Sequence, residues 1–221
     1  MKEIILDTET TGISVIEGHR IVEIACLELE NLIPTGNKFH YCVNPERKVS
    51  DKAFEIHGYT DEFLLKQKKF VEIKEEFLNF IKDKKLIIHN AEFDLAHLNN
   101  ELSLSGGDKI SNEVIDTLVL ARDKFPGSQV SLDALCKRYR IDNSMRTKHN
   151  ALLDCALLAK VYINLLDQRE PTLDFQKNNE KYESQKDVEN LSYFKKVVLI
   201  TSDEISNHKN YLNKYLKKNF F

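Results

Sequence analysis

Two carboxylates close a short apolar run near the start of the chain, where Asp7 and Glu9 follow Ile4-Ile5-Leu6. The apolar run predicts a buried strand, and the Thr-Thr-Gly that ends at Gly12 predicts the turn after it. Residues two apart in a strand point to the same face, so both carboxylates should project together. Adjacent carboxylates repel each other unless cations bind between them. Hard oxygen ligands of this kind favour Mg²⁺ or Mn²⁺.

The Asp-x-Glu pattern alone is weak evidence for a metal site, because most chains of this size contain one by chance. A second pair, Asp187 and Glu189, lies in a polar stretch with no strand before it. The apolar run before Asp7 and the Thr-Thr-Gly after Glu9 favour the first pair as the functional one.

Two further acidic residues stand at predicted helix starts. Asp94 follows a short apolar strand at 86–88, and Asp154 lies near the start of a long helical pattern. The spacing His-x4-Asp occurs twice, with His89 before Asp94 and His149 before Asp154, so spacing alone does not identify a catalytic histidine. Five residues turn by about 140° along an ideal helix, so we expect His149 just before the helix and Asp154 inside it.

Each of these residues also has a purely structural interpretation. Asp94 could complement a helix dipole, worth about a few tenths of a kcal/mol. His149 and Asp154 could lie on a solvated surface. However, Leu152, Leu153 and Cys155 surround Asp154 in the sequence. A carboxylate in such apolar surroundings should be partly buried, and it then needs a cation or a hydrogen-bond donor.

Composition indicates an ordinary globular protein. The chain has 221 residues, of which 42% are hydrophobic and 30% charged, enough for one sizeable core. Its net charge of −3 excludes a global basic field, so any nucleic-acid binding must rest on local patches. The four cysteines form no C-x-x-C pair, which indicates reduced thiols of a cytoplasmic protein. We find no candidate membrane span and no signal-peptide pattern.

The order of the predicted elements indicates an α/β fold with a mixed sheet. The first three strands follow one another with short links, as in an antiparallel meander, and later strands alternate with helices. Strands are predicted at 4–6, 21–29, 38–43, 86–88 and 114–115. Helices are predicted at 70–81, 93–104, 118–124, 132–138 and 148–166.

The composition changes after residue 166. Residues 167–196 include 13 charged and only 7 aliphatic or aromatic side chains, too few to offset the entropy of ordering, so we interpret them as a polar linker. Residues 197–221 form a second small unit. There Thr201 and Glu204 predict a capping box before a helix. The apolar stripe of that helix consists of Ile205, His208, Tyr211, Leu212, Tyr215 and Leu216.

Several segments together carry a family resemblance. The main ones are Asp7-Thr8-Glu9-Thr10-Thr11-Gly12, His89-Asn90-Ala91-Glu92-Phe93-Asp94, 132–139 and His149-Asn150-Ala151-Leu152-Leu153-Asp154. They resemble the motifs of the DnaQ-like 3′–5′ exonucleases, the DEDD group with a catalytic histidine. Residues 19–24, 53–58 and 141–144 extend the resemblance, which covers about residues 2–166. Within the family, the proofreading subunits of bacterial DNA polymerase III are the most similar.

The resemblance implies a ribonuclease H-like exonuclease fold, with a mixed five-stranded sheet flanked by helices in residues 1–166. It also implies two-metal hydrolysis of the 3′-terminal phosphodiester of single-stranded or frayed DNA, with release of nucleoside 5′-monophosphates. Asp7, Glu9, Asp94 and Asp154 match the residues that hold two divalent metals, Mg²⁺ or Mn²⁺, and His149 matches the general base. The positions that match terminal-nucleotide contacts are Thr8, Thr10, Thr11, Gly12, His57, Asn90 and Phe93.

Some positions depart from the family pattern or add to it. Lys52 stands where these proofreading subunits often have Glu, so a carboxylate contact with substrate would be lost or reversed in sign. Glu92 adds a charge near the metals, and we expect it to point to solvent. We expect His89 to serve packing or local hydrogen bonding. A basic run before His149 could be a solvated face, but we expect it to contact the DNA backbone. It consists of Lys137, Arg138, Arg140, Arg146 and Lys148.

The resemblance also implies partners. Residues 197–221 would dock on the polymerase alpha subunit, with Tyr211 and Tyr215 as aromatic anchors. Residues 170–175 resemble a sliding-clamp peptide, although Glu170 replaces the usual Gln; a random linker segment is the plain alternative. Two other functions remain open: an RNA-processing exonuclease of the same group, and a non-catalytic docking module. The second predicts loss of a metal ligand, and all four are present.

Overall fold

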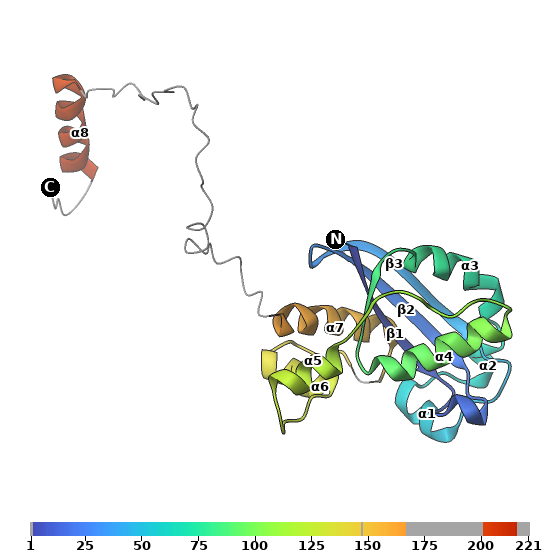
Figure 1. Ribbon diagram of the computed structural model, residues 1–221. Coiled ribbons are helices and arrows are strands. Elements are labelled where there is room, and N and C mark those ends of the chain that lie inside the picture. Colours follow the sequence, from blue (N-terminus) through green and yellow to red (C-terminus); the bar gives the residue numbers. More distant parts are fainter. Residues whose placement is uncertain (1, 147, 167–200, 216–221) are drawn as a thin grey trace, which may run out of the picture. The chain divides into compact units, whose positions relative to one another are not determined.

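The computed structural model describes residues 2–146, 148–166 and 201–215 (Figure 1). It divides into two units, within residues 1–172 and 173–221, and each is described by itself. The predicted linker at 167–196 and the clamp-like peptide at 170–175 lie outside the described residues.

The first unit is built on a mixed sheet with the strand order β4-β3-β2-β1-β5-β6. β1, β2 and β3 form the predicted antiparallel meander, whereas β5 runs parallel to β1, and β6 parallel to β5. The strands are β1 (Lys2–Thr10), β2 (Ile21–Glu30), β3 (Ile33–Asn44), β4 (Lys68–Lys69), β5 (Lys85–Ile88) and β6 (Val114–Asp116).

Helices cover both faces of this sheet (Figure 1). The first unit contains a short 3-10 helix, η1 (Val15–Glu17), besides its α-helices. The α-helices are α1 (Asp51–His57), α2 (Asp61–Leu64), α3 (Phe70–Ile81), α4 (Ala91–Leu104), α5 (Thr117–Lys124), α6 (Leu132–Tyr139) and α7 (Ala151–Leu165).

Strand β1 is buried on both faces, and successive side chains alternate between these faces. This alternation determines on which face of the sheet the acidic side chains lie. Ile5 belongs to the core cluster formed with α5, α6 and α7. Ile4 and Leu6 belong to the opposite cluster, formed with α3 and α4. Asp7 and Glu9 share the parity of Ile5, so they emerge on the face that α7 covers.

The two central parallel strands differ in length. β5 pairs with β1 only from Glu3 to Ile5, and the last paired residue on β5 is Ile87. β1 continues to Thr10 against β2. The end of β1 that carries the acidic residues therefore lies beyond its paired stretch with β5.

The mixed α/β fold is confirmed, with differences at its margins. The sheet has six strands rather than five, because the two-residue β4 pairs with Val43 and Asn44 of β3. Helices α1 and α2 were not expected from the periodicity. Helix α7 begins at Ala151 rather than at 148, because the side chain of Asn150 caps it by accepting from the Leu153 N–H. Helix α4 begins at Ala91, two residues earlier than predicted.

The second unit contains α8 (Ser202–Tyr215). The predicted capping box is confirmed: the Thr201 N–H donates to Glu204 at 2.9 Å, and the Glu204 N–H donates to Thr201 Oγ1 at 3.3 Å. Ile205 and Tyr211 are exposed on this helix. Across the described ranges, the structure contains no helix with the length and apolar character needed to span a membrane.

Candidate active site

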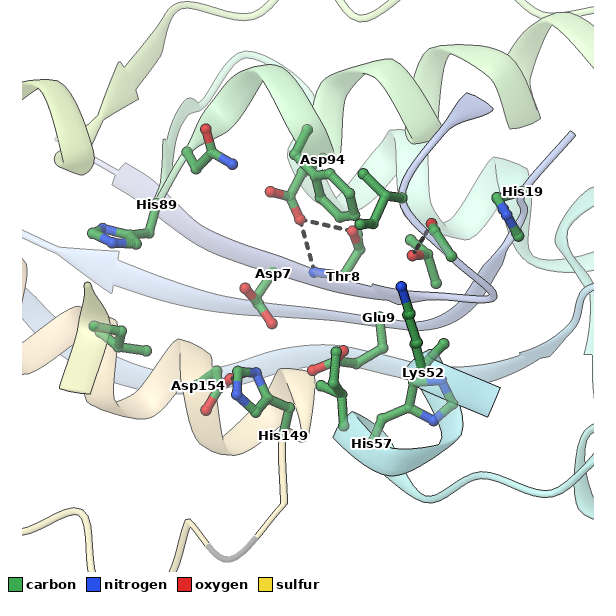
Figure 2. Close-up of a pocket in the computed structure, with 18 of the residues that line it drawn as sticks. Asp7, Thr8, Glu9, His19, Lys52, His57, His89, Asp94, His149 and Asp154 are labelled. Carbon is green, nitrogen blue, oxygen red and sulfur yellow. Dashed lines mark hydrogen bonds and ion pairs between the residues drawn. The ribbon is translucent and has the colours of Figure 1, made fainter. Parts of the chain in front are cut away.

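A cavity of about 700 Å³ opens at the end of β1 and collects the four predicted acidic residues. Figure 2 shows Asp7 and Glu9 on the side of Asp154 and His149, with Asp94 across β1. Of the predicted site residues, those that line the cavity are Asp7, Thr8, Glu9, Thr10, Gly12, His57, Asn90, Phe93, Asp94, His149 and Asp154. The sequence motifs, although far apart along the chain, thus meet at one cavity.

Three elements position the four carboxylates. β1 supplies Asp7 and Glu9, while Asp94 and Asp154 lie in the first turns of α4 and α7. Asp94 is fastened to β1 because its Oδ1 accepts from both the Thr8 N–H, at 2.9 Å, and Thr8 Oγ1, at 2.7 Å. Asp94 and Asp154 are each 3% exposed, so both are buried acidic groups.

The electrostatics of this cluster favour a bound cation. Burial raises the pKa of Asp7 well above its ordinary value, and the charges of Asp94 and Glu9 raise it further. Burial, followed by the charge of Asp154, raises the pKa of Glu9 to about 8. The pKa of Asp94 is also raised, mainly by burial. Carboxylates that resist ionisation next to one another are stabilised when divalent cations neutralise them.

Arg146 supplies a positive charge within the cluster. Its Nε and Nη2 donate to the two oxygens of Asp154, at 2.6 and 2.8 Å. Its Nη1 donates to Asp133 Oδ2 at 2.6 Å, and its Nη2 also contacts His149 Nδ1 at 2.9 Å. The Arg146 side chain is only 7% exposed. The guanidinium of Arg146 thus lies inside the acidic cavity, and contact of the basic run with the DNA backbone stays a prediction.

The two candidate histidines have different surroundings. His149 Nδ1 lies 3.6 Å from Asp154 Oδ2, and its side chain is 45% exposed. Burial and then the charge of Arg146 lower its pKa. His89 Nδ1 instead contacts Thr117 Oγ1 at 2.9 Å, which is the local hydrogen bonding expected for it. The geometry places His149, and not His89, beside Asp154.

A further buried carboxylate, Glu23 of β2, supports the start of α7. Its Cα pairs with that of Glu9, so it lies next to the cluster. One oxygen contacts His40 Nε2 at 2.7 Å and accepts from Asn150 Nδ2 at 2.9 Å. The other oxygen accepts from the Ala151 N–H at 2.9 Å. Glu23 thereby holds the residues that directly follow His149.

The turn after β1 builds the rim of the cavity. Thr10 Oγ1 donates to the Gly12 carbonyl at 2.7 Å. A Cβ on Gly12 would meet the His19 ring at 2.3 Å, so only glycine admits this ring. Thr11 is fully buried and does not line the cavity, because its hydroxyl contacts His19 Nδ1 and accepts from the Arg20 N–H.

The other predicted nucleotide contacts lie around the cavity wall. His57 is 5% exposed, and its Nε2 makes no hydrogen bond with any described residue. Its ring stacks on Tyr59 at 5.1 Å between centroids. Phe93 is partly buried and packs against His97 at 4.6 Å. Asn90 adopts a left-handed conformation, with its N–H bonded to Asp116 Oδ1.

Lys52 and Glu92, which depart from the family pattern, are both exposed. Lys52 lines the cavity, whereas Glu92 does not, as expected for a side chain that points to solvent. In the rest of the basic run, Arg138 stacks over Phe125 at 4.2 Å and the Lys148 ammonium lies 5.1 Å from the Phe54 ring.

Sequence reasoning gave no role to Glu23, and it placed Arg146 only among the basic residues expected to contact the DNA backbone. A charged residue inside the apolar run 21–29 is a visible signal for Glu23, because a charge on a central strand needs partners. Arg146 was visible only as one basic residue among several. Its contacts depend on the path of the loop before α7, which carries no periodic pattern.

Comparison with known proteins agrees with this geometry. Residues 4–162 match the family described as Exonuclease (RNase_T). The chain is 46% identical to the DNA polymerase III subunit epsilon of Rickettsia felis, over 98% of both chains. It is 48% identical to that of Escherichia coli K12, over 73% of this chain and 70% of the relative.

Among solved structures, the fold resembles exonuclease X in complex with 5′-overhanging duplex DNA. The TM-score is 0.58 and the identity 26%, over 75% of this chain and 92% of the other. The matched family covers all the residues that line the cavity and the whole sheet except Lys2 and Glu3, and the relatives extend the match to nearly the full chain. The chain therefore belongs to the exonuclease family and, within it, to the DNA polymerase III epsilon subunits, the proofreading exonucleases.

Proposed function

We propose that the protein removes 3′-terminal nucleotides from single-stranded or frayed DNA during replication, and that the four clustered carboxylates and His149 are its catalytic groups. The observation that carries this proposal is the convergence of Asp7, Glu9, Asp94 and Asp154 from three elements in one cavity. Such clustering is unfavourable in the absence of cations and gives the fold no packing advantage.

Asp7, Glu9, Asp94 and Asp154 would hold two divalent ions, Mg²⁺ or Mn²⁺. The donor set fits, because all four ligands are hard carboxylate oxygens. Burial, followed by neighbouring negative charge, raises the pKa of Asp7 and of Glu9, so a cation between these side chains would be stabilising. When bound, such ions activate the attacking water and stabilise the leaving 3′ oxygen.

The chain's own residues bind the nucleotide and handle the proton. An imidazole nitrogen of His149 accepts the proton of the attacking water, and a lowered pKa keeps that ring neutral at physiological pH. Phe93 offers a partly buried ring on which the terminal base can stack. His57 lines the same cavity, and its imidazole can bond to the nucleotide. Thr11 acts indirectly, by holding the turn and His19.

Cleavage of matched DNA and RNA primers, paired or mispaired at the 3′ end, tests this function. We expect faster release of nucleoside 5′-monophosphates from mispaired DNA, because fraying exposes its 3′ end. Asp7→Ala and Asp154→Ala should abolish release while the fold persists. Preference for RNA would support the RNA-processing alternative, and activity that survives both substitutions would refute the assignment of the ligands.

The alpha subunit of the polymerase is the proposed partner of residues 197–221, in a cytoplasmic replication complex. The exposed Ile205 and Tyr211 of α8 support helix-in-groove docking, since an isolated helix of this length is marginal in water. A chain that ends at Leu166 should keep its full exonuclease activity on free DNA, which would show that it is folded, but should no longer co-purify with alpha. Retained binding would place the contact on the exonuclease domain.

The sliding clamp is the proposed partner of residues 170–175. The sequence Glu170-Pro171-Thr172-Leu173-Asp174-Phe175 supplies apolar and aromatic anchors, but Glu170 must be desolvated. Clamp binding should be weak, should tighten with Glu170→Gln and should be lost with Phe175→Ala. An unchanged affinity for Phe175→Ala would exclude this peptide.

A further inference from the structure

Arg146 pairs with both oxygens of one of the four carboxylates, that of Asp154. Its Nε donates to Asp154 Oδ1 and its Nη2 to Oδ2, so a single guanidinium uses both oxygens. The two side chains are 7% and 4% exposed, so water screens this pair little. An oxygen ligand cannot bind a metal ion at short range while a guanidinium occupies the same side of the carboxylate.

The same guanidinium also occupies His149. Nη2 of Arg146 lies 2.9 Å from His149 Nδ1. Arginine has only donors, so Nδ1 must be the acceptor in this contact. In a neutral ring the proton is then on Nε2, and the one lone pair that could accept a proton is already used. One residue therefore holds a predicted ligand and the predicted base in an inactive arrangement.

We propose that Arg146 is an internal, exchangeable cation: it neutralises Asp154 in the metal-free chain, and a divalent metal displaces it, which frees Asp154 and His149 together. This inference rests on the proposed metal site. The guanidinium takes the place of the metal ion, because its positive charge lies against one of the proposed ligands. The cluster of carboxylates requires such a positive charge.

Asp133 determines where the displaced guanidinium goes. It bonds to the third arginine nitrogen, Nη1, at 2.6 Å, and its own side chain is 55% exposed. The contact to Asp133 does not involve Asp154, so it can persist after displacement. Arg146 would then remain at the mouth of the cavity, where a guanidinium fork suits the phosphate of an incoming 3′ end.

Direct measurement of Mn²⁺ binding to the full-length chain tests this exchange without relying on activity. Titration calorimetry would compare wild type with Arg146→Gln, Arg146→Lys and Lys137→Gln at one pH. Lys137→Gln is the matched control, because it removes an exposed positive charge from the same basic run, outside the cavity. The competing pair is a bidentate hydrogen bond between charged groups. Its removal in Arg146→Gln should therefore tighten Mn²⁺ binding roughly 10- to 100-fold.

Arg146→Lys keeps the charge but loses the fork, so its affinity should lie between those of wild type and Arg146→Gln. Without metal, Arg146→Gln should melt at a lower temperature than wild type and should gain more from Mn²⁺. Unchanged or weaker Mn²⁺ binding in Arg146→Gln would overturn the proposal. Wild-type Mn²⁺ affinity in Arg146→Lys would also overturn the proposal, since charge repulsion alone would then explain the tighter binding of the Gln variant.

Failure of the proposed metal site itself would give a different result. Wild type would then not bind Mn²⁺, or Asp154→Asn would bind Mn²⁺ as tightly as wild type does.

Discussion

The substitution Glu23→Gln tests how the start of α7 is held. Glu23 is fully buried and accepts from three groups: His40, Asn150 and the Ala151 N–H. The amide has the same shape but turns one acceptor oxygen into a donor. If the new NH₂ group faces Ala151, two donors meet with no acceptor between them. If it faces the other side, His40 can change tautomer and accept, but Asn150 Nδ2 loses Glu23 as an acceptor and keeps only Tyr59 Oη.

The cost follows from these contacts. At least one hydrogen bond to a charged acceptor is lost and a buried donor is left unpaired, for roughly 2–4 kcal/mol of unfolding free energy. In a domain of this size, this corresponds to a decrease of roughly 5–15 °C in melting temperature. Because Asn150 directly follows His149, the base should also move. Misplacement of catalytic groups by about 1 Å costs up to roughly 10²-fold in rate, so kcat should fall by roughly 10- to 100-fold.

Thermal unfolding followed by circular dichroism, together with nucleotide release at saturating DNA, measures both effects. Glu92→Gln is the matched control, since Glu92 is an exposed glutamate near the same cavity that does not line it. That variant should melt within about 2 °C of wild type, as expected for surface substitutions. If Glu23→Gln has the melting temperature of the Glu92→Gln control and the kcat of wild type, then Glu23 does not position α7 and the reasoning is wrong.

Three further predictions use other residues. His149→Ala should lower kcat by roughly 10²–10⁴ while Mn²⁺ still stabilises the fold, and His89→Ala should do less; equal losses in folded variants would contradict the choice of base. Lys52→Ala should raise KM and should reduce the slope of log binding constant against log salt concentration by about one, whereas Lys52→Arg should change neither. An unchanged slope would exclude a phosphate contact. The third concerns Glu28, whose pKa is lowered to about 2, first by a hydrogen bond from Lys84. Its stabilisation should be present above pH 4.5 and lost as the pH falls toward 2, so wild type should exceed Glu28→Gln by about 1–3 kcal/mol at pH 7 and match it in acid; a difference that does not depend on pH would refute this linkage.

Apolar runs and helical spacing made most of the sheet predictable. β1 carries three consecutive aliphatic residues before Asp7, and the helical spacing of 70–81 matches α3 residue for residue. The missed elements lack such patterns. β4 consists of two lysines, Lys68 and Lys69, which carry no apolar pattern, and it pairs with Val43 and Asn44 of β3. Helices α1 and α2 span only two turns or less, although Ser50 and Thr60 cap them and gave a local signal.

The supporting contacts of the site could not be predicted from one sequence. Glu23 and Asn150 are 127 positions apart, and they meet only because α7 packs on the face of β2 that Glu23 occupies. The acidic motifs were visible because each lies at the end of a patterned strand or the start of a patterned helix. Arg146 lies in an irregular loop, where a long side chain can reach many partners and no periodicity selects one.

The short pairing between β5 and β1 also explains how a carboxylate can be built into the sheet. β5 stops pairing at Ile5 of β1, so the Thr8 N–H lies past the last rung of that parallel ladder. Asp94 Oδ1 accepts from it in place of a strand carbonyl. A longer β5 would offer a backbone oxygen for the same N–H and would push the start of α4 away. The catalytic end of the sheet thus depends on an interrupted ladder, in which a side chain at a helix start replaces the missing strand residues. Insertions between β5 and α4 should therefore be less tolerated here than in the exposed loop around Gly106, where added atoms meet no neighbour.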